Sequence, residues 1–428
     1  MKCRNCKKTK FEKIINLEPQ PISSVFFDKK KYKLKKYPLN LYECNSCKLI
    51  QFSRLAPLKD MYGSTYGYRT SLSPLMINHM KKKFDEVKKM KILKKDFNIL
   101  DIGSNDGTFL NFFKKLKIKL NLYAIDPSAG KFKSFYNKKI NLIVDFFSKE
   151  KIDKFFNIKK EDKKKFSLIT SFAMFYDVED PNSFCRDVNK ILNPEGLWIS
   201  EFSYFPLLLK NLTYDQICHE HVTYYTLNTF NKIINKNGLK IVDLSFNEIN
   251  GGSIQVICAK KNSKIKCNNK KILNVLNDEK LIDFDSYKRF NKRINNTKKI
   301  IQLFLKKNNK KNDIVGYGAS TKGNIVLNHC KINGKDLNYI CDANPYKYNR
   351  YTPGSNIKII SKTKMRKINP KYLFVLIWSF RSEVIKQEKV FLKKGGKLIF
   401  HLPSFHIIDK HNYKKYLKED FKTFSYNY

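Results

Sequence analysis

Five short apolar runs alternate with helix-length spacers between residues 97 and 202. The runs cover residues 97–102, 120–125, 142–144, 166–170 and 197–202. Runs of this length are typical of strands that are buried on both faces, and the spacers are long enough to return over the sheet as helices. Because such crossovers join parallel strands, this region predicts an α/β fold with a parallel sheet.

Two further apolar runs, 240–244 and 253–259, are separated only by a short loop. A short connection lets two strands pair antiparallel. Five parallel strands followed by an antiparallel pair is the strand inventory of the class I methyltransferase fold. We therefore expect a Rossmann-like domain of this kind over residues 71–260.

The C-terminal part of the chain repeats the alternation on a smaller scale. Apolar runs at 313–317, 337–341, 372–378 and 397–400 predict a second Rossmann-like domain over residues 313–428. Residues 261–312 are lysine-rich, have a helical pattern at 283–305 and are assigned as a helical linker. Several domains suit a chain of 428 residues, which is too long for one ordinary core.

Two Cys-x-x-Cys pairs lie near the N-terminus, Cys3 with Cys6 and Cys44 with Cys47. Zinc takes four thiolates tetrahedrally, and the two pairs are separated as in a zinc ribbon. Four protein ligands leave no open position for water, so the ion would serve folding and not catalysis. Neither pair has a thioredoxin-like context, which disfavours a redox pair or free thiols. We expect a zinc-binding domain over residues 1–70.

The formal net charge of +47 raises the question of a nucleic-acid partner. The lysines are spread over the whole length in short runs such as 81–83 and 163–165. This distribution favours a solvated surface that attracts anionic small molecules. No run of about 18 apolar residues is present, and the N-terminus lacks the apolar core of a signal peptide. We expect a cytoplasmic protein with neither a membrane nor a specific nucleic-acid partner.

The first strand of the predicted sheet ends in a glycine turn over residues 101–107 (DIGSNDG). Its GxxxG spacing differs from the GxGxxG that cradles a dinucleotide pyrophosphate, and it suits S-adenosylmethionine, which has no phosphate. Asp126 closes the second strand, where its carboxylate can accept both ribose hydroxyls. Asp145 follows the third strand and could flank the adenine. The alternative is a turn that binds nothing. The predicted cofactor ligands are Asp101, Gly103, Ser104, Asn105, Gly107, Asp126 and Asp145.

Residues 218–225 (CHEHVTYY) hold two imidazoles, a carboxylate and two phenols directly after the fifth strand. Substrates bind off the carboxyl ends of such strands, and a neutral histidine can remove a proton. We choose His221 as the base, with Glu220 or Glu201 to orient it or the substrate. His219 and His221 do not match the HExxH pattern of a catalytic zinc site. A single histidine is more often structural, and the clustering is what favours catalysis here.

Two other segments offer substrate contacts. Tyr66 and Tyr68 follow the zinc region and precede His79, and these phenols suit either a sugar or enolate oxygen or packing at a domain junction. In the C-terminal region, residues 316–323 (GYGASTKG) follow a strand and open a helix, where backbone amides and Lys322 suit a phosphate. This turn fits a nucleotide-sugar anchor, a vestigial dinucleotide site or a tight turn alone.

In their order along the chain, these motifs resemble the three-domain S-adenosylmethionine-dependent sugar C-methyltransferases of deoxysugar biosynthesis. The similarity covers nearly the whole chain. Besides the Cys pairs it includes residues 66–71 (YGYRTS), 101–110 (DIGSNDGTFL), 174–181 (MFYDVEDP), 214–225 (YDQICHEHVTYY), 250–253 (NGGS), 316–324 (GYGASTKGN), 341–349 (CDANPYKYN) and 351–354 (YTPG).

The resemblance implies methylation of a carbon next to the ketone of a nucleotide-linked 4-keto-6-deoxy sugar. It implies that His221 removes the α-proton, that Glu220 positions the base or the sugar, and that the C-terminal domain helps to hold the nucleotide sugar. The enolate would then attack the sulfonium methyl. The implied cofactors are S-adenosylmethionine and structural zinc, and we expect a monomer. Further candidates are Tyr68 and Tyr224 for catalysis, and Tyr66, His79, Asn250 and Lys322 for substrate binding.

Cys218 and Asp177 depart from the family, because some members carry a tyrosine and a histidine there, with roles in substrate handling. The departures bear on which sugar and which carbon react. Three alternative functions use part of the same residues. An O- or N-methyltransferase would keep the donor and the base, a zinc-containing nucleic-acid-binding protein would use the charge, and a nicotinamide-dependent enzyme would use residues 316–323.

Overall fold

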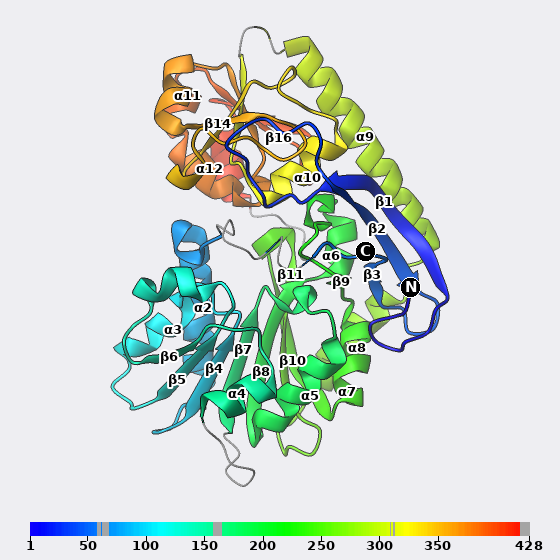
Figure 1. The fold of residues 1–428 in the computed structure, drawn as a ribbon, viewed down its shortest axis with the longest axis vertical. Coiled ribbons are helices and arrows are strands. Elements are labelled where there is room, and N and C mark those ends of the chain that lie inside the picture. The colour runs from blue at the N-terminus through cyan, green and yellow to red at the C-terminus, as the bar shows by residue number, and fades with distance from the viewer. Residues whose placement is uncertain (58–60, 62–67, 157–164, 309, 311–312, 420–428) are drawn as a thin grey trace.

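Three sheets organise the protein. The computed structural model describes residues 1–57, 61, 68–156, 165–308, 310 and 313–419. A seven-stranded sheet occupies the middle of the chain, a six-stranded sheet follows it, and a four-stranded sheet lies near the N-terminus. In Figure 1 the seven-stranded sheet lies in the lower half, the C-terminal sheet lies at the top, and the N-terminal strands lie on the right beside both.

The middle sheet has the order β10-β11-β8-β7-β4-β5-β6. Strands β4 to β8 pair in parallel, whereas β11 pairs antiparallel with β8 and β10 with β11. This is the strand order of the class I methyltransferase fold, so the predicted α/β class is confirmed. The strands are β4 (Asn98–Ile102), β5 (Asn121–Ile125), β6 (Ile140–Ile143), β7 (Phe166–Phe172), β8 (Leu192–Ser203), β10 (Leu239–Asn247) and β11 (Ser253–Lys260).

Helices cover both faces of this sheet. Consecutive strand residues point to opposite faces, so Ile99 packs with Phe84 of α2, whereas Leu100 packs with the cluster that holds Val188 of α5. This alternation explains why consecutive positions of a central strand can both be apolar. The helices around the sheet are α2 (Pro74–Lys89), α3 (Thr108–Asn111), α4 (Lys149–Phe155), α5 (Pro181–Ile191), α6 (Phe205–Lys210), α7 (Leu227–Lys236) and α8 (Asn269–Glu279).

The N-terminal sheet contains β1 (Phe11–Pro21), β2 (Lys36–Cys44) and β3 (Ile50–Phe52), all antiparallel. Its fourth strand, β9 (Thr223–Tyr224), comes from far along the chain and pairs Tyr224 with Ile50. The segment that contains both candidate histidines is therefore attached to the N-terminal sheet at its end. Sequence analysis placed residues 223–224 in the middle domain and did not predict this pairing.

The C-terminal sheet has the order β14-β13-β12-β15-β16-β17, with only β17 antiparallel. Four of its strands match predicted apolar runs, and the two edge strands β14 and β17 were not predicted. The elements are β12 (Ile314–Tyr317), α10 (Thr321–His329), β13 (Tyr339–Asp342), β14 (Lys358–Ser361), α11 (Lys362–Ile368), β15 (Tyr372–Val375), α12 (Arg381–Gln387), α13 (Lys389–Lys393), β16 (Lys397–Phe400), β17 (His406–Ile408) and α14 (Tyr413–Lys418).

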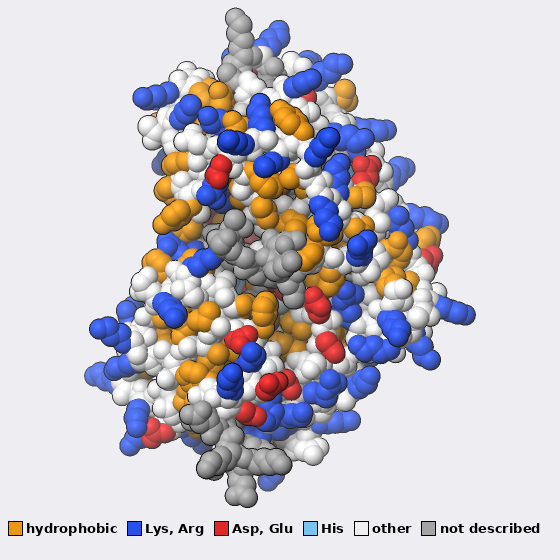
Figure 2. Space-filling view, in the orientation of Figure 1, with side chains coloured by type: hydrophobic (Ala, Val, Ile, Leu, Met, Phe, Trp, Pro, Cys, Tyr) orange, Lys and Arg blue, Asp and Glu red, His pale blue; other side chains and the backbone are white. Residues whose placement is uncertain are grey.

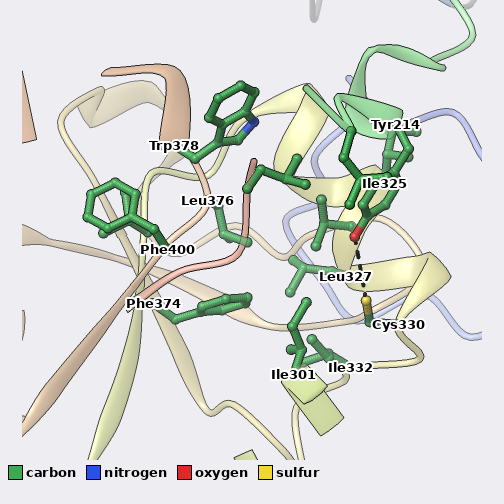
Figure 3. Close-up of a cluster of buried hydrophobic side chains, with 14 of the residues drawn as sticks. Tyr214, Ile301, Ile325, Leu327, Cys330, Ile332, Phe374, Leu376, Trp378 and Phe400 are labelled. Carbon is green, nitrogen blue, oxygen red and sulfur yellow. Dashed lines mark hydrogen bonds between the residues drawn. The ribbon is translucent and has the colours of Figure 1, made fainter. Parts of the chain in front are cut away.

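One hydrophobic core joins the C-terminal sheet to the rest of the molecule. Helix α9 (Phe284–Asn308) runs from β1 toward the C-terminal sheet, and its Phe290 and Ile301 belong to that core. In Figure 3, Tyr214, which precedes the candidate histidines, reaches Cys330 at the end of α10 with an O–S distance of 3.8 Å. The segment around residue 214 is therefore packed against the C-terminal domain.

Lysine and arginine side chains are scattered over the face shown in Figure 2 and do not form one stripe. This distribution agrees with a solvated basic surface. In the part of the chain that the structure describes, no helix combines the length and the apolar character needed to cross a membrane.

Candidate active site

A cavity of about 390 Å³ lies at the carboxyl ends of the middle strands. Its lining includes Asp101 and Ile102 of β4, Ile125 of β5, Phe172 of β7 and Glu201 of β8. The chain leaves β4 for β5 on one side and later adds β7 on the other, so the cavity lies where the strand order reverses. Open α/β sheets bind ligands at this position, and the volume suits a small molecule.

The glycine turn after β4 forms one wall of the cavity. Gly103 has a φ of +73°, and a Cβ at this position would lie 2.8 Å from Cγ of Met174. Only glycine fits both the backbone and the contact. The N–H of Asn105 donates to Oδ2 of Asp126 at 2.9 Å, and the N–H of Ser128 donates to its Oδ1 at 2.6 Å. Asp126 therefore joins the turns after β4 and β5.

Asp101 is buried at the end of β4 and accepts a hydrogen bond from the hydroxyl of Thr170 at 2.7 Å. Burial raises the pKa of Asp101 to about 7, and the charge of Asp126 adds to this, whereas the bond from Thr170 opposes it. A ligand with a cationic group beside Asp101 would favour the ionised carboxylate. Such a ligand would therefore lower the pKa of Asp101.

Five of the seven predicted cofactor residues line the cavity: Asp101, Gly103, Ser104, Asn105 and Asp126. Gly107 instead begins α3 with a φ of +72°, beside the ring of Tyr136.

Asp145 also differs from its predicted position beside the cofactor. Its carboxylate pairs with Lys151 of α4 at 2.7 Å and accepts the N–H of Phe146, and this pair lowers the pKa of Asp145. In the loop between β6 and α4, Phe146 and Phe147 line the cavity. An aromatic surface suits a flat purine.

The segment that begins at Tyr68 lies over the glycine turn. The side chain of Asn105 donates to the carbonyl of Tyr68 at 3.1 Å and accepts the N–H of Thr70 at 2.9 Å. The N–H of Ser71 donates to the carboxylate of Asp106 at 2.9 Å. Tyr68 and Thr70 consequently line the cavity. The other predicted tyrosine, Tyr66, lies outside the described residues.

His79 lies in a buried ion-pair cluster on the cavity wall. Its Nε2 is 2.7 Å from Oε1 of Glu201, while Nζ of Lys83 and Nδ2 of Asn247 lie 2.9 and 2.7 Å from Oε2. Burial alone would raise the pKa of Glu201, but the charges of His79 and Lys83 outweigh it and hold this pKa at about 2. The carboxylate of Glu201 therefore stays ionised, and His79, Lys83 and Asn247 bind both of its oxygens. The structure gives no contact between Glu201 and His221, which Glu201 was expected to orient.

His221 lies next to the cavity wall formed after β7. Its ring packs on the ring of Tyr176 with centroids 4.0 Å apart, and the N–H of Val222 donates to the carbonyl of Tyr176 at 2.9 Å. Asp177, the residue after Tyr176, lines the cavity. Burial lowers the pKa of His221 to about 3, and the positive charge of Lys322 contributes to the shift. The imidazole is therefore neutral at physiological pH, as a base must be.

Glu220 and His219, the two residues before His221 in the motif, have different surroundings. Glu220 is only 8% exposed, and neither carboxylate oxygen has a hydrogen-bond partner among the residues that the structure describes. Buried carboxylates need such partners, so this one is suited to a ligand that offers donors. His219 faces the N-terminal sheet, with Nε2 3.2 Å from the carbonyl of Gln20 and the ring edge-on to Tyr37.

The C-terminal domain contributes Lys322 and Trp378 to this region. Nζ of Lys322 donates to Oδ1 of Asn250 at 2.7 Å, and Nε1 of Trp378 donates to Oδ2 of Asp215 at 2.8 Å. The backbone of Asn250 has a φ of +59°, in the connection between β10 and β11. Lys322 lies in the first turn of α10. Ser320 caps this helix, and its hydroxyl accepts the N–H of Gly323. The phosphate site predicted there stays a prediction.

Tyr224 lies in the apolar core. Its ring is edge-on to Phe52 with centroids 5.8 Å apart, and its hydroxyl donates to the carbonyl of Gln216 at 3.3 Å. The pairing of β9 with β3 holds the ring there. Tyr224 is not among the described residues that line the cavity, so the structure shows a packing role for it.

The four N-terminal cysteines come together as predicted. Their sulfur atoms all lie within 4.8 Å of one another, with 3.5 Å between Cys3 and Cys47 and 3.6 Å between Cys6 and Cys44. Zinc–sulfur bonds of about 2.3 Å place tetrahedral ligands roughly 3.8 Å apart, so the donor set fits zinc. Four thiolates fill the coordination shell, and the ion is structural.

Three protein families match successive parts of the chain. Residues 3–62 match a zinc binding domain, residues 76–244 a methyltransferase domain, and residues 248–403 a C-methyltransferase C-terminal domain. The C-methyltransferase NovU of Streptomyces niveus is 26% identical over 381 residues, which cover 87% of this chain and 88% of NovU. The chain belongs to the three-domain S-adenosylmethionine-dependent C-methyltransferases.

Solved methyltransferase structures are also similar to part of the chain. The plantazolicin methyltransferase BpumL, determined with SAH, is 14% identical and covers 44% of this chain and 86% of its own, with a TM-score of 0.34. An S-adenosylmethionine-dependent methyltransferase from Clostridium acetobutylicum is 14% identical and covers 42% and 91%, with a TM-score of 0.31. The assignment rests on the family matches, which replace the alternative functions considered from the sequence. The protein is a C-methyltransferase that uses S-adenosylmethionine and carries structural zinc.

Proposed function

We propose that the enzyme methylates the carbon next to the ketone of a nucleotide-linked 4-keto-6-deoxy sugar. The observation that carries the proposal is the position of His221, whose buried imidazole packs on Tyr176, the residue before the cavity-lining Asp177. A carbon acid needs a base of this kind, because the ketone makes the α-hydrogen acidic only enough for assisted removal.

The residues around His221 suit an acceptor with several hydroxyl groups. Glu220 offers two unpaired carboxylate oxygens, which accept hydrogen bonds from sugar hydroxyls. The segment 215–221 lies against the C-terminal domain through Asp215 and Trp378, so an acceptor here would be held between the middle and C-terminal domains. Such a small-molecule substrate agrees with the resemblance of the motifs to sugar C-methyltransferases.

In the proposed mechanism, residues of this chain bind and orient the donor and the acceptor, and one of them deprotonates the acceptor. When bound, S-adenosylmethionine supplies an electrophilic methyl group on its sulfonium. Asp126 would accept the ribose hydroxyls, and Asp101 would lie near the cationic amino-acid end. His221 would take the α-proton, and the C–H electron pair would form the nucleophilic enolate. Holding both reactants in contact would supply much of the rate. We place this reaction in the cytoplasm, carried out by a monomer.

The test is mass spectrometry of dTDP-4-keto-6-deoxyglucose, and of other nucleotide-linked keto sugars, incubated with enzyme and S-adenosylmethionine in deuterated water. We expect one added methyl group and loss of one α-hydrogen. Deuterium uptake without methylation would retain the base but reject the acceptor. An enzyme that binds the donor and changes none of the sugars would refute the proposal.

A further inference from the structure

We propose that Lys322 is a catalytic residue whose ammonium stabilises the negative charge that forms on the acceptor's carbonyl oxygen. This inference deepens the proposed function and rests on it. Lys322 belongs to α10 of the C-terminal domain, whereas the base His221 lies between the middle and N-terminal sheets. The reaction centre would therefore be completed by a residue from a different domain.

The structure holds the ammonium in a defined place. Nζ of Lys322 donates to Oδ1 of Asn250 at 2.7 Å, and the Asn250 carbonyl accepts the side-chain amide of Gln216. The backbone of α10 is anchored nearby, because Nδ2 of Asn324 donates to the carbonyl of Ser23 at 2.7 Å. An ammonium has three donors, and the described residues use one of them. Two donors remain for a ligand.

The groups that face this ammonium are mostly acidic. Burial lowers the pKa of Lys322, and the nearby carboxylates of Asp215, Asp177 and Glu220 oppose that shift. The charge of Lys322 in turn lowers the pKa of His221. Burial raises the pKa of Cys218 well above its usual value, so the thiol stays neutral. Lys322 is thus a partly buried cation within a group of carboxylates next to the base.

The ammonium of Lys322 and the carboxylate of Glu220 do not form an ion pair in the described part of the chain. Both oxygens of Glu220 lack a hydrogen-bond partner among the described residues, although the carboxylate is buried and feels the charge of Lys322. A buried carboxylate and a partly buried ammonium that stay apart each keep unused hydrogen-bonding capacity, which is costly unless a ligand fills it. An acceptor that offers donors to Glu220 and a carbonyl oxygen to Lys322 satisfies both groups.

The step balances without another reactant. His221 takes the α-proton, and the C–H electron pair becomes the C=C bond as charge moves to the carbonyl oxygen. Lys322 keeps its protons and strengthens its hydrogen bond to that oxygen. When the enolate carbon attacks the methyl group, the S–C electron pair stays on sulfur and the carbonyl re-forms. A preorganised cation in a dry site acts where charge develops and needs no reorganisation.

The experiment compares Lys322→Gln, Lys322→Met and Lys322→Arg with wild type, using dTDP-4-keto-6-deoxyglucose. Deuterium exchange at the α-carbon is measured with S-adenosylhomocysteine in place of the donor, and methyl transfer is measured separately. We expect Lys322→Gln, which can still donate to Asn250, to lower both rates by about 10²- to 10³-fold, with partial recovery in Lys322→Arg. The exposed Lys335→Met is the matched control and should retain both rates.

A second readout separates this role from a structural one. Because Lys322 lowers the pKa of His221, its removal in Lys322→Met should raise that pKa in an NMR titration of the imidazole. Exchange and methylation at wild-type rates in Lys322→Gln would overturn the inference and leave the proposed function intact. A wild type that binds the donor but neither exchanges nor methylates would overturn both.

Discussion

Nε2 of His79 lies 2.7 Å from Oε1 of Glu201, joining helix α2 to the fifth parallel strand at the wall of the cavity. Lys83, one helical turn further along α2, binds the other carboxylate oxygen at 2.9 Å. A single buried carboxylate thus fixes the helix over the end of the sheet. Because α2 also supplies Met76 and Met80 to the lining, the shape of the cavity depends on this ion pair.

Replacing Glu201 with Gln should therefore destabilise the fold. The change removes the buried counter-charge of His79 and Lys83 and leaves Lys83 only the partly exposed Glu86 at 3.5 Å. Breaking one side of a buried pair costs about 3–5 kcal/mol. The measurement is the free energy of unfolding in urea. The exposed pair of Lys81 and Asp85 on the same helix is the control, and Asp85→Asn should cost no more than about 1 kcal/mol. Equal losses in the two variants would contradict the prediction.

Glu201 should also make stability depend on pH. Its pKa in the folded state is about 2, below the ordinary 4.5, so it contributes stability at neutral pH. That contribution is lost as the pH falls from about 4.5 to about 2. Glu201→Gln lacks the titrating group and should show a flatter decrease in this range, measured by urea unfolding. Parallel curves for variant and wild type would show that the ion pair does not control acid stability.

His221→Ala should lower turnover by about 10²-fold or more and leave donor binding unchanged. Since the pKa of the buried imidazole is about 3, we also expect no acid limb from His221 between pH 8 and pH 5. The check is the pH profile of kcat/KM for the acceptor at saturating donor. His411→Ala, at an exposed position, is the control. A limb near pH 6.5 that disappears in His221→Ala would contradict the low pKa.

Gly103→Ala should weaken donor binding by about tenfold or more. The added Cβ would meet Met174 at 2.8 Å and would hold a non-glycine residue at a φ of +73°. Gly395→Ala is a matched control, because Gly395 has a φ of +94° but nothing within 4 Å of a built Cβ. Calorimetric titration with S-adenosylhomocysteine measures both. Unchanged affinity in Gly103→Ala would show that the turn does not contact the donor.

Cys44→Ser should abolish stoichiometric zinc and lower the melting temperature. Three thiolates and a hydroxyl bind zinc much less tightly, and the metal supplies folding free energy to small domains. Metal analysis and thermal unfolding provide the check. Cys267→Ser is the control, since Cys267 is outside the four-sulfur cluster. A zinc-free variant with an unchanged melting temperature would reject a structural role.

Much of the fold could be predicted because its signals are local. Apolar runs at 97–102 and 397–400 mark strands, and the glycine turn marks where the first strand meets its ligand. Strands β14 and β17 escaped prediction because each has only two consecutive apolar residues, whereas β13, β15 and β16 have three or four. The two residues of β9 carry no strand signal, and their partner strand is more than 170 positions away.

The candidate site was predictable in its residue types but less so in its contacts. Lys83 belongs to a lysine run that suggests solvent, yet it is only 4% exposed, because packing of α2 turns it onto Glu201. Asp145 precedes the cavity-lining Phe146, but Lys151 draws its carboxylate aside. Which neighbour in a loop faces a ligand depends on such partners.

The domain types, the zinc ligands and the strand that ends in the glycine turn could be read from the sequence, because each depends on spacing within a short segment. Three other relationships emerged from the packing: His219 faces the N-terminal sheet, Glu220 has no hydrogen-bond partner among the described residues, and Lys322 reaches Asn250 from another domain. Those relationships arise where three sheets pack around residues 214–225, and a contact between distant segments leaves no periodic pattern in either one.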